Sequence, residues 1–470
     1  MIKTKSNITE GPLFLPMLKF AVPLILTGVL QVLYNMADSI VVGKFSGDYN
    51  ALGAVGSAGA LANLVINIMV SLSAGAGVVI AQLCGAKNKR DISDAAHTAI
   101  GLSLVGGALM MLVGFAVMRP ALVAMGTQDI YLEKSILYIT ILCIGIPASS
   151  VYNFGAAILR AAGDSKTSLY ILSSSGLINV LLNLVFVIFF DMSVDGVAIS
   201  TVVSQYISAV WILAVLMKRK HEDYSIRPTN IRIHGRILKR ILRIGIPITL
   251  QSALFSLSNV IISSAVNTFP PTVVDAKTIA FSIEAITGAV MTAFANMTIT
   301  FIGQNYGAKK FSRINKVFLY GLIQVAVIGL IVSYAEILLG PSLSMLYIDA
   351  KNPEKDAIIE AVAEIFKVML STYFVCGIME VGSGVLKALG CTVKSMIASL
   401  VGLATRVLWV LFVVPIPKFH TIPGLFVAYV IAWSVTVIIQ VFLCIHTWHK
   451  LEISKNVKLE KTGEIYAKAD

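Results

Sequence analysis

The chain has 470 residues, of which 57% are hydrophobic and only 13% are charged, and its mean hydropathy is +0.84. Soluble domains carry about 25% charged residues, so this composition excludes an ordinary soluble protein and indicates a membrane protein with several spans. The net charge of +12 would also fit a nucleic-acid-binding protein, but the distribution of that charge argues otherwise.

Segments long and apolar enough to cross a bilayer recur along the whole chain. A spanning helix needs about 20 mostly apolar residues, and the first such segment is too long for the apolar region of a cleavable signal peptide. We predict twelve transmembrane helices, at 16–43, 52–82, 93–117, 135–159, 168–190, 194–217, 241–268, 277–302, 316–337, 360–386, 394–415 and 422–446.

Lysine and arginine gather in alternate connections between these helices. Most of them lie in the N-terminus, at 87–90, 160–166, 218–243, 309–316 and 387–394, and in the C-terminal tail. This is the positive-inside pattern. It predicts a multi-pass protein of the plasma (inner) membrane with both termini in the cytoplasm. The basic charge therefore sets topology, and we expect no nucleic-acid partner.

Three polar residues share one face of the first predicted helix. Gln31, Asn35 and Asp38 follow at spacings of four and three residues, which places them on one side of a helix. A carboxylate in the bilayer costs roughly 3 kcal/mol on insertion scales, and it normally faces a protein interior or a wet cavity, where it binds a cation or a proton. Asp38 is therefore the leading candidate for a coupling-ion site.

Other polar side chains fall at a similar depth in the first half. With a rise of about 1.5 Å per residue, Asn183 and Thr201 lie near the level of Asp38, and Asn179 lies one turn below Asn183. Carboxylate, amide and hydroxyl oxygens suit Na⁺, and a lone buried carboxylate can equally take up a proton. The alternative is that Asn179, Asn183 and Thr201 only cross-link helices by hydrogen bonds.

The chain also repeats itself. Residues 19–45 and 243–269 align without gaps, and two further matches follow in the same order at nearly the same offset. They are Gln82-x-x-Gly85-Ala86-Lys87 with Gln304-x-x-Gly307-Ala308-Lys309, and Leu159-Arg160-Ala161-x-Gly163 with Leu386-Lys387-Ala388-x-Gly390. Matches that keep order and spacing indicate an internal duplication, and an even number of helices in each copy gives the two halves parallel topology.

These features predict an all-α polytopic membrane protein with twelve transmembrane helices in two six-helix lobes, related by a pseudo-two-fold axis along the membrane normal. The predicted parts are an N-terminal lobe at 1–217, a basic cytoplasmic linker at 218–240, a C-terminal lobe at 241–446 and a cytoplasmic tail at 447–470. Paired lobes favour alternating access. A pore is the alternative, although no filter-like loop occurs.

The second half contains charged residues within its predicted helices. Glu380 and Arg406 fall at similar depths in consecutive helices, and two interpretations stay open. They form a charge pair that locks the helices together, or Glu380 is a second carboxylate that contacts the coupling ion or the substrate. Glu284 is placed nearer the outer surface, where it is partly solvated.

Two prolines and two further side chains complete the candidates. Pro23 and Pro247 occupy equivalent places in the first and seventh predicted helices. Because proline removes a backbone hydrogen bond and kinks a helix, each marks either a static kink or a bend point. Gln31 and Tyr34 are candidates for the wall of a substrate cavity, and packing in the core or against lipid is the alternative.

No catalytic constellation occurs in the sequence. The six histidines form no HExxH motif, no phosphate-binding glycine-rich loop occurs, and the five cysteines form no CxxC pair. This argues against a membrane enzyme and an ATP-driven pump. We expect no cofactor and no metal other than Na⁺ at Asp38.

The sequence resembles the multidrug and toxic compound extrusion (MATE) family over residues 10–450. Pro23, the Gln31-x-x-Tyr34-Asn35-x-x-Asp38 pattern, the two Gln-x-x-Gly-Ala-Lys boxes and the two glycine-ended turns carry the resemblance. It implies an outward cleft between two bundles and export of organic, often cationic, compounds against a Na⁺ or H⁺ gradient. We therefore expect a cation-coupled multidrug exporter that acts as a monomer in the bilayer.

Within the family, the first half is more similar to the DinF-like branch, which uses a first-helix aspartate with polar partners on helices 5 and 6. Asp38, Asn179 and Thr201 match those positions, and Asn183 stands where that branch often has a second aspartate. The NorM-like branch carries acidic residues where this chain has Phe255 and Cys376, one turn from Glu380. The resemblance thus places coupling mainly in the first lobe and leaves the ion open.

A lipid-linked saccharide flippase of the same broad superfamily is the alternative function. It would favour a strongly cationic central cavity, whereas Arg406 is the one arginine that the sequence places near the membrane centre.

Overall fold

The structure is a computed structural model that describes residues 8–45, 51–125, 127–348 and 352–450. Throughout these residues the regular structure is helical. Twelve helical segments of the described chain are long and apolar enough to cross a membrane. The predicted all-α polytopic fold with twelve spans is confirmed, while most of the predicted tail lies outside the described residues.

The first half of the chain supplies six spans, joined to the second half by a linker with a single 3-10 turn, η2 (Pro228–Asn230). The fifth span ends in a π-helical turn, η1 (Val185–Phe189). The helices are α1 (Phe14–Phe45), α2 (Ala51–Gly85), α3 (Lys89–Ala124), α4 (Asp129–Ala161), α5 (Lys166–Leu184) and α6 (Val194–Lys218).

The second half repeats this order, with its fourth span interrupted by a 3-10 turn, η3 (Leu370–Thr372), and its fifth span again ending in a π-helical turn, η4 (Trp409–Val413). The helices are α7 (Gly235–Val266), α8 (Pro271–Gly307), α9 (Phe311–Ser344), α10 (Lys355–Met369), α11 (Tyr373–Ala388), α12 (Thr392–Leu408) and α13 (Ile422–Lys450).

The backbone repeats along with the sequence. Gly163 and Gly390, which end the second pair of repeated motifs, have φ angles of +95° and +78°. Lys87 and Lys309, which end the first pair, have φ angles of +54° and +57°. The left-handed region is costly for residues with a side chain and open to glycine, so the duplicated turns share one backbone geometry.

The described residues form two compact units. Unit 1 lies between Leu26 and Thr249, and unit 2 combines residues 8–25 with residues 250–450. Two helices therefore belong to both units: α1 changes unit after Ile25, and α7 changes unit after Thr249. In each of them a buried or half-buried proline, Pro23 or Pro247, stands two residues before that point. The bend-point role of these prolines stays a prediction.

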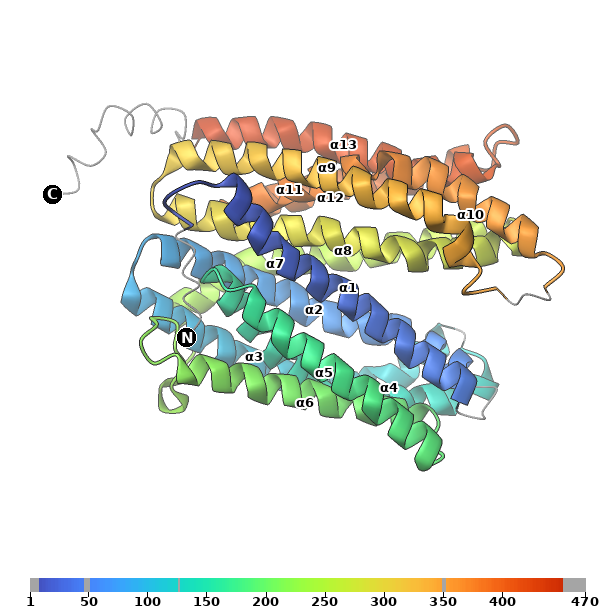
Figure 1. Ribbon diagram of the computed structural model, residues 1–470, viewed down its shortest axis with the longest axis horizontal. Coiled ribbons are helices and arrows are strands. Elements are labelled where there is room, and N and C mark those ends of the chain that lie inside the picture. The colour runs from blue at the N-terminus through green and yellow to red at the C-terminus, as the bar shows by residue number, and fades with distance from the viewer. Residues whose placement is uncertain (1–7, 46–50, 126, 349–351, 451–470) are drawn as a thin grey trace. The chain divides into compact units, whose positions relative to one another are not determined.

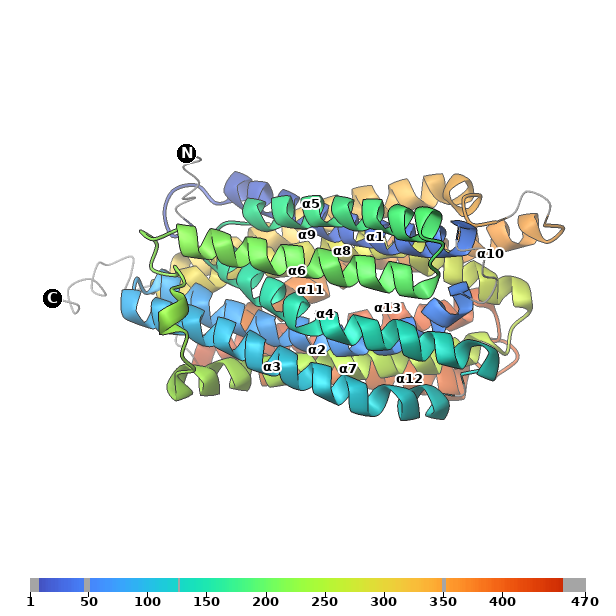
Figure 2. The same ribbon diagram turned by 90° about the horizontal axis from the view of Figure 1, so that it is seen from below.

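In unit 1, α4 is the central helix, and it packs against α2, α3 and α6, while α5 packs on α6 (Figures 1 and 2). Small residues allow close helix contacts. A Cβ atom on Gly75 of α2 would lie 2.7 Å from the Cα atom of Gly245 on α7, and a Cβ atom on Gly107 of α3 would lie 2.8 Å from Pro147 on α4.

In unit 2, α11 takes the corresponding central place and packs against α8, α9 and α13, while α12 packs on α13 (Figure 1). The first part of α1 is held here. The Gln324 side chain donates to the Phe14 carbonyl at 2.6 Å, and the Phe20 and Phe301 rings are in edge contact, with centroids 5.6 Å apart.

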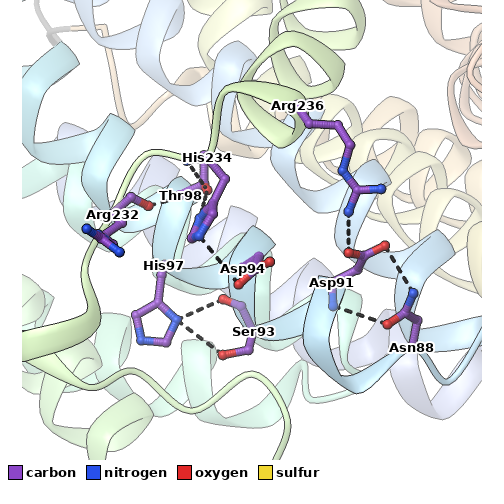
Figure 3. A network of polar contacts seen from close by, with 9 residues as sticks. All are labelled: Asn88, Asp91, Ser93, Asp94, His97, Thr98, Arg232, His234 and Arg236. Carbon is purple, nitrogen blue, oxygen red and sulfur yellow. Dashed lines mark hydrogen bonds and ion pairs between the residues drawn. The ribbon is translucent and has the colours of Figure 1, made fainter.

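The basic linker is docked on unit 1 by specific contacts (Figure 3). The buried His97 side chain of α3 accepts a hydrogen bond from the Arg227 backbone N–H at 3.0 Å through Nε2. Thr98 accepts one from the His234 backbone N–H at 3.1 Å, and Arg236 pairs with Asp91. The linker is thus a folded element, fixed along one face of α3.

A second group of contacts fixes the start of the linker to the loop between α4 and α5. Arg219 donates to Asp164 at 2.5 Å and to Thr167 at 3.0 Å, and Thr167 also donates to Asp164 through its backbone N–H and its hydroxyl. Burial alone would raise the pKa of the Asp164 carboxyl, but these hydrogen bonds and the Arg219 charge outweigh burial and lower that pKa. Asp164 is therefore held as a carboxylate.

Candidate functional site

Asp38 meets a polar partner in unit 1. The Asn183 side chain of α5 donates from Nδ2 to Asp38 Oδ1 at 2.5 Å. Asn183 is fully buried and Asp38 is half-buried, so the hydrogen bond lies at the edge of the helix packing. The structure thus brings together two of the residues that the sequence placed at one depth.

The second polar atom of Asn183 has no partner. With Nδ2 donating to Asp38, the amide oxygen Oδ1 is buried and accepts no hydrogen bond from any described residue. A buried carbonyl oxygen without a donor is costly. The Asn183 amide oxygen is therefore a buried polar atom close to the Asp38 carboxylate for which the described residues supply no donor.

Asn179 and Thr201 form a second contact one turn from Asn183. Asn179 Nδ2 donates to Thr201 Oγ1 at 3.4 Å, and Thr201 Oγ1 donates to the Val197 carbonyl at 2.9 Å. This pair joins α5 to α6, which is the cross-linking role that the sequence left open. An oxygen role beside Asp38 stays a prediction for both.

The remaining candidates on α1 have different surroundings. The Tyr34 hydroxyl donates to the Ser173 carbonyl of α5 at 3.0 Å, and the Tyr34 ring occupies the space that a Cβ atom on Gly176 would need. Tyr34 therefore packs α1 on α5. Gln31 and Asn35 are exposed on the surface of unit 1, and their predicted roles stay predictions.

The predicted pairing of Glu380 with Arg406 is wrong. Neither a hydrogen bond nor an ion pair joins these two described residues. Arg406, which is buried in unit 2, donates from Nε to Ser258 at 3.0 Å and from Nη2 to Asn259 at 3.1 Å. Similar depth did not produce contact, because the Arg406 side chain extends toward α7.

Two aromatic rings complete the surroundings of Arg406. The guanidinium carbon lies 5.1 Å from the centroid of the Phe255 ring and 4.7 Å from that of the Tyr429 ring. Cation–π contacts of this kind stabilise a desolvated guanidinium by about 2 kcal/mol. Aromatic and polar neighbours thus accommodate the charge. Glu380 is half-buried on α11, and its predicted role as a substrate or ion contact stays a prediction.

Glu284 is half-buried in unit 2 and accepts a hydrogen bond from Tyr373 of α11, while its predicted place near the outer surface stays a prediction. From Tyr373 a chain of ring contacts runs through Trp433, with centroids 5.0 Å apart, to Tyr429, whose ring centroid is 6.1 Å from that of Trp433. Tyr429 faces Arg406. An aromatic layer therefore separates the Glu284 carboxylate from the Arg406 guanidinium.

The sequence analysis missed a further carboxylate, Glu336 of α9. It is only 5% exposed and lies close to Thr287 of α8. The predicted ninth helix ended at residue 337, which would leave this glutamate at the membrane surface. The helix in fact continues to Ser344, two turns further. Ser333, a hydroxyl residue that precedes Glu336 by one turn, was the available signal.

The comparisons with known proteins agree with this architecture. A probable multidrug resistance protein, YoeA of Bacillus subtilis, is 25% identical over 93% of this chain and 95% of its own length. The multidrug export protein MepA of Staphylococcus aureus is 21% identical over 81% of this chain and 83% of its own.

Among solved structures, an outward-facing multidrug resistance MATE family transporter matches with a TM-score of 0.86 at 21% identity, covering 97% of this chain and 100% of that one. The MatE family model matches residues 23–185 and residues 247–411, which correspond to the two repeated halves. The chain is therefore a multi-pass membrane protein that belongs to the MatE family.

Proposed function

We propose that this protein is a secondary active exporter of organic compounds, cationic or amphiphilic in character, which moves them out of the cell in exchange for Na⁺ or H⁺ by alternating access. Family membership and the multidrug transport named for its relatives support export. One observation supports cation coupling: the Asp38 carboxylate in contact with Asn183, whose amide oxygen is buried without a donor.

A cation binds at Asp38 and Asn183 and contacts the amide oxygen of Asn183, which otherwise has no partner. This contact stabilises only the ion-bound state of the protein, and a coupling ion must favour one state in this way to shift a conformational equilibrium. Asn179 and Thr201 fix α5 relative to α6 beneath this site. We place the protein in the plasma membrane as a monomer, with both termini in the cytoplasm.

The test is transport of a fluorescent cationic dye in liposomes that contain the purified protein. Na⁺ and pH gradients are imposed separately, and an ionophore for each ion serves as the control. We expect one gradient to drive dye movement and its ionophore to abolish that movement. Dye movement at the same rate with and without either gradient would exclude coupling. No dye movement under either gradient would exclude this substrate class.

The alternative of a lipid-linked saccharide flippase receives no added support from Arg406. Its guanidinium is already held by Ser258, Asn259 and two rings. That alternative would be favoured if the protein flipped a labelled lipid-linked pyrophosphate sugar in the same liposomes and transported no cationic dye.

A further inference from the structure

The linker carries an exposed arginine whose charge no described residue neutralises. The backbone carbonyl of Arg232 accepts a hydrogen bond from Thr98 at 3.4 Å, and its guanidinium points away from that contact (Figure 3). This guanidinium forms neither an ion pair nor a hydrogen bond with a described residue. The next residue, Ile233, is 42% exposed. We propose that residues 231–233, the linker tip, bind the headgroup of an anionic phospholipid.

The contacts of the linker with α3 show how far the tip reaches along that helix. They begin at His97, reach Gly101 at the tip and return to Asp91. A Cβ atom on Gly101 would lie 3.0 Å from Ile233 and 3.6 Å from Ile231, so this glycine lets the tip lie directly against the helix. The tip is therefore the part of the linker that lies furthest along α3.

The same helix marks where the hydrocarbon of the bilayer begins. The exposed large apolar side chains of α3 start at Leu104. Toward the other end, the exposed Arg119 pairs with Glu133, and counting about 20 residues back from Arg119 reaches about residue 99. Both markers place Gly101 within about one helical turn of the boundary between headgroups and hydrocarbon. The tip therefore lies at headgroup level, which suits a neighbouring arginine and isoleucine.

The charge of the linker complements an anionic lipid surface. Residues 218–243 contain nine lysines and arginines but only two acidic residues. The acidic side chains of α3 beside the linker already have partners, because Asp91 pairs with Arg236 and Asp94 lies 3.6 Å from Nε2 of His234. The positive charge at the tip is thus left to an external anion, and basic groups at a membrane surface attract anionic lipids.

A phospholipid suits this surface better than a free phosphate ion. A guanidinium can bind the phosphate oxygens of either one through two parallel hydrogen bonds. Only the lipid also supplies acyl chains, which would cover Ile233 and the exposed side chains of Leu104 and Val105 on α3. We therefore assign the site to a lipid of the leaflet on the linker side, which is the cytoplasmic leaflet in the orientation that we predict.

The first test is native mass spectrometry of the full-length protein in a neutral detergent, titrated with phosphatidylglycerol or with phosphatidylcholine that has the same acyl chains. We expect phosphatidylglycerol to bind at least about fivefold more tightly. Arg232→Gln should weaken its affinity by about fivefold, equivalent to about 1 kcal/mol. Arg232→Lys, which keeps the charge but not the paired hydrogen bonds, should have an intermediate affinity. Lys418→Gln is the control, because Lys418 is an exposed basic residue far from the linker in sequence.

A second measurement tests the depth of the tip independently of its charge. In a variant without the five native cysteines, Ile233→Cys is labelled with bimane and placed in phosphatidylglycerol bilayers whose acyl chains carry bromine. We expect strong quenching of this label by bromine. The same label on Thr229→Cys, an exposed linker residue outside the tip, should be quenched weakly.

Equal affinity for the two lipids would overturn the proposal, as would an unchanged phosphatidylglycerol affinity in Arg232→Gln. An equal loss in Lys418→Gln would overturn it by showing that diffuse charge attracts the lipid. Displacement of the lipid by inorganic phosphate would identify a free-phosphate site instead, and absence of quenching at Ile233→Cys would place the tip in water. None of these measurements requires transport, so their outcome is independent of the proposed exporter.

Discussion

Asp38 accepts a hydrogen bond from the amide nitrogen of Asn183, whereas the amide oxygen of Asn183 has no hydrogen-bond partner among the described residues. We expect Asp38→Asn to reduce gradient-driven efflux to background while the protein folds normally, because the amide cannot take up the coupling charge. Asn183→Leu, which removes the unpaired oxygen and the hydrogen bond, should lower the efflux rate by at least about tenfold. Dye efflux from liposomes measures both.

Asp129→Asn is the control for this pair, because Asp129 is an exposed residue in the first turn of α4. Wild-type efflux in a well-folded Asp38→Asn variant would remove Asp38 from the mechanism. An Asn183→Leu variant that transports normally would leave Asp38 without its proposed partner.

Glu380 and Arg406 should behave as independent residues. Arg406→Gln is expected to lower the free energy of unfolding by about 2–4 kcal/mol, because the hydrogen bonds to Ser258 and Asn259 and both ring contacts are lost. Adding Glu380→Gln should not recover that loss, since sites without contact are additive within about 0.5 kcal/mol. Thermal unfolding of the two single variants and the double variant gives the coupling energy, and a large rescue would show a pair that the structure lacks.

At the scale of elements, the duplicated turns give a symmetric prediction. Gly163→Ala and Gly390→Ala should each destabilise the protein by about 1–2 kcal/mol, because alanine resists a positive φ. Lys87→Gly and Lys309→Gly should each stabilise it by up to about 1 kcal/mol for the same reason. Thermal unfolding tests all four, and opposite signs within either pair would show that the two copies of a turn are not equivalent.

The contact between Asp164 and Arg219 predicts a pH dependence for the attachment of the linker. Because the folded pKa of Asp164 lies below its ordinary value of about 4, its stabilisation is complete above about pH 4 and disappears as pH falls through the folded pKa. Asp164→Asn should therefore cost about 2 kcal/mol near neutral pH.

The difference between Asp164→Asn and wild type should shrink as the pH of the unfolding experiment is lowered below about 4. Asp356→Asn, an exposed first-turn residue of α10, provides a comparison without such contacts. A destabilisation by Asp164→Asn that is the same at all pH values would mean that hydrogen-bond geometry, not charge, fixes the linker.

At the scale of the whole molecule, topology is testable with single cysteines. In a variant without the five native cysteines, we expect a cysteine at Lys418 to react with an impermeant maleimide on intact cells. A cysteine at Lys220 should react only after permeabilisation, because the positive-inside pattern places the linker in the cytoplasm. Both positions are exposed. The reverse labelling pattern would invert the orientation and move Asp38 to the opposite side.

The sequence predicted the helices because spanning segments are nearly continuous apolar runs, and it predicted the repeat because the same motifs recur in order at the ends of equivalent helices. Helix ends were less accurate, and this hid Glu336: α9 extends past residue 337 to Ser344. Depth arguments worked for Asp38 with Asn183 but not for Glu380 with Arg406. Depth fixes only the position along a helix, whereas contact also depends on the direction in which each side chain extends.

The aromatic layer of unit 2 has an optical consequence. Trp433 is 7% exposed and lies between Tyr373, which holds an acidic group, and Tyr429, which faces a guanidinium. When the acidic group is ionised, it and the guanidinium on the other side set an electric field across the indole ring, and the energy of the excited state of the ring depends on that field. Neutralising the acidic side would change the field and shift the emission colour. The fluorescence emission of Trp433 should therefore report the charge state of the acidic group. Replacing the three other tryptophans with phenylalanine would isolate this signal.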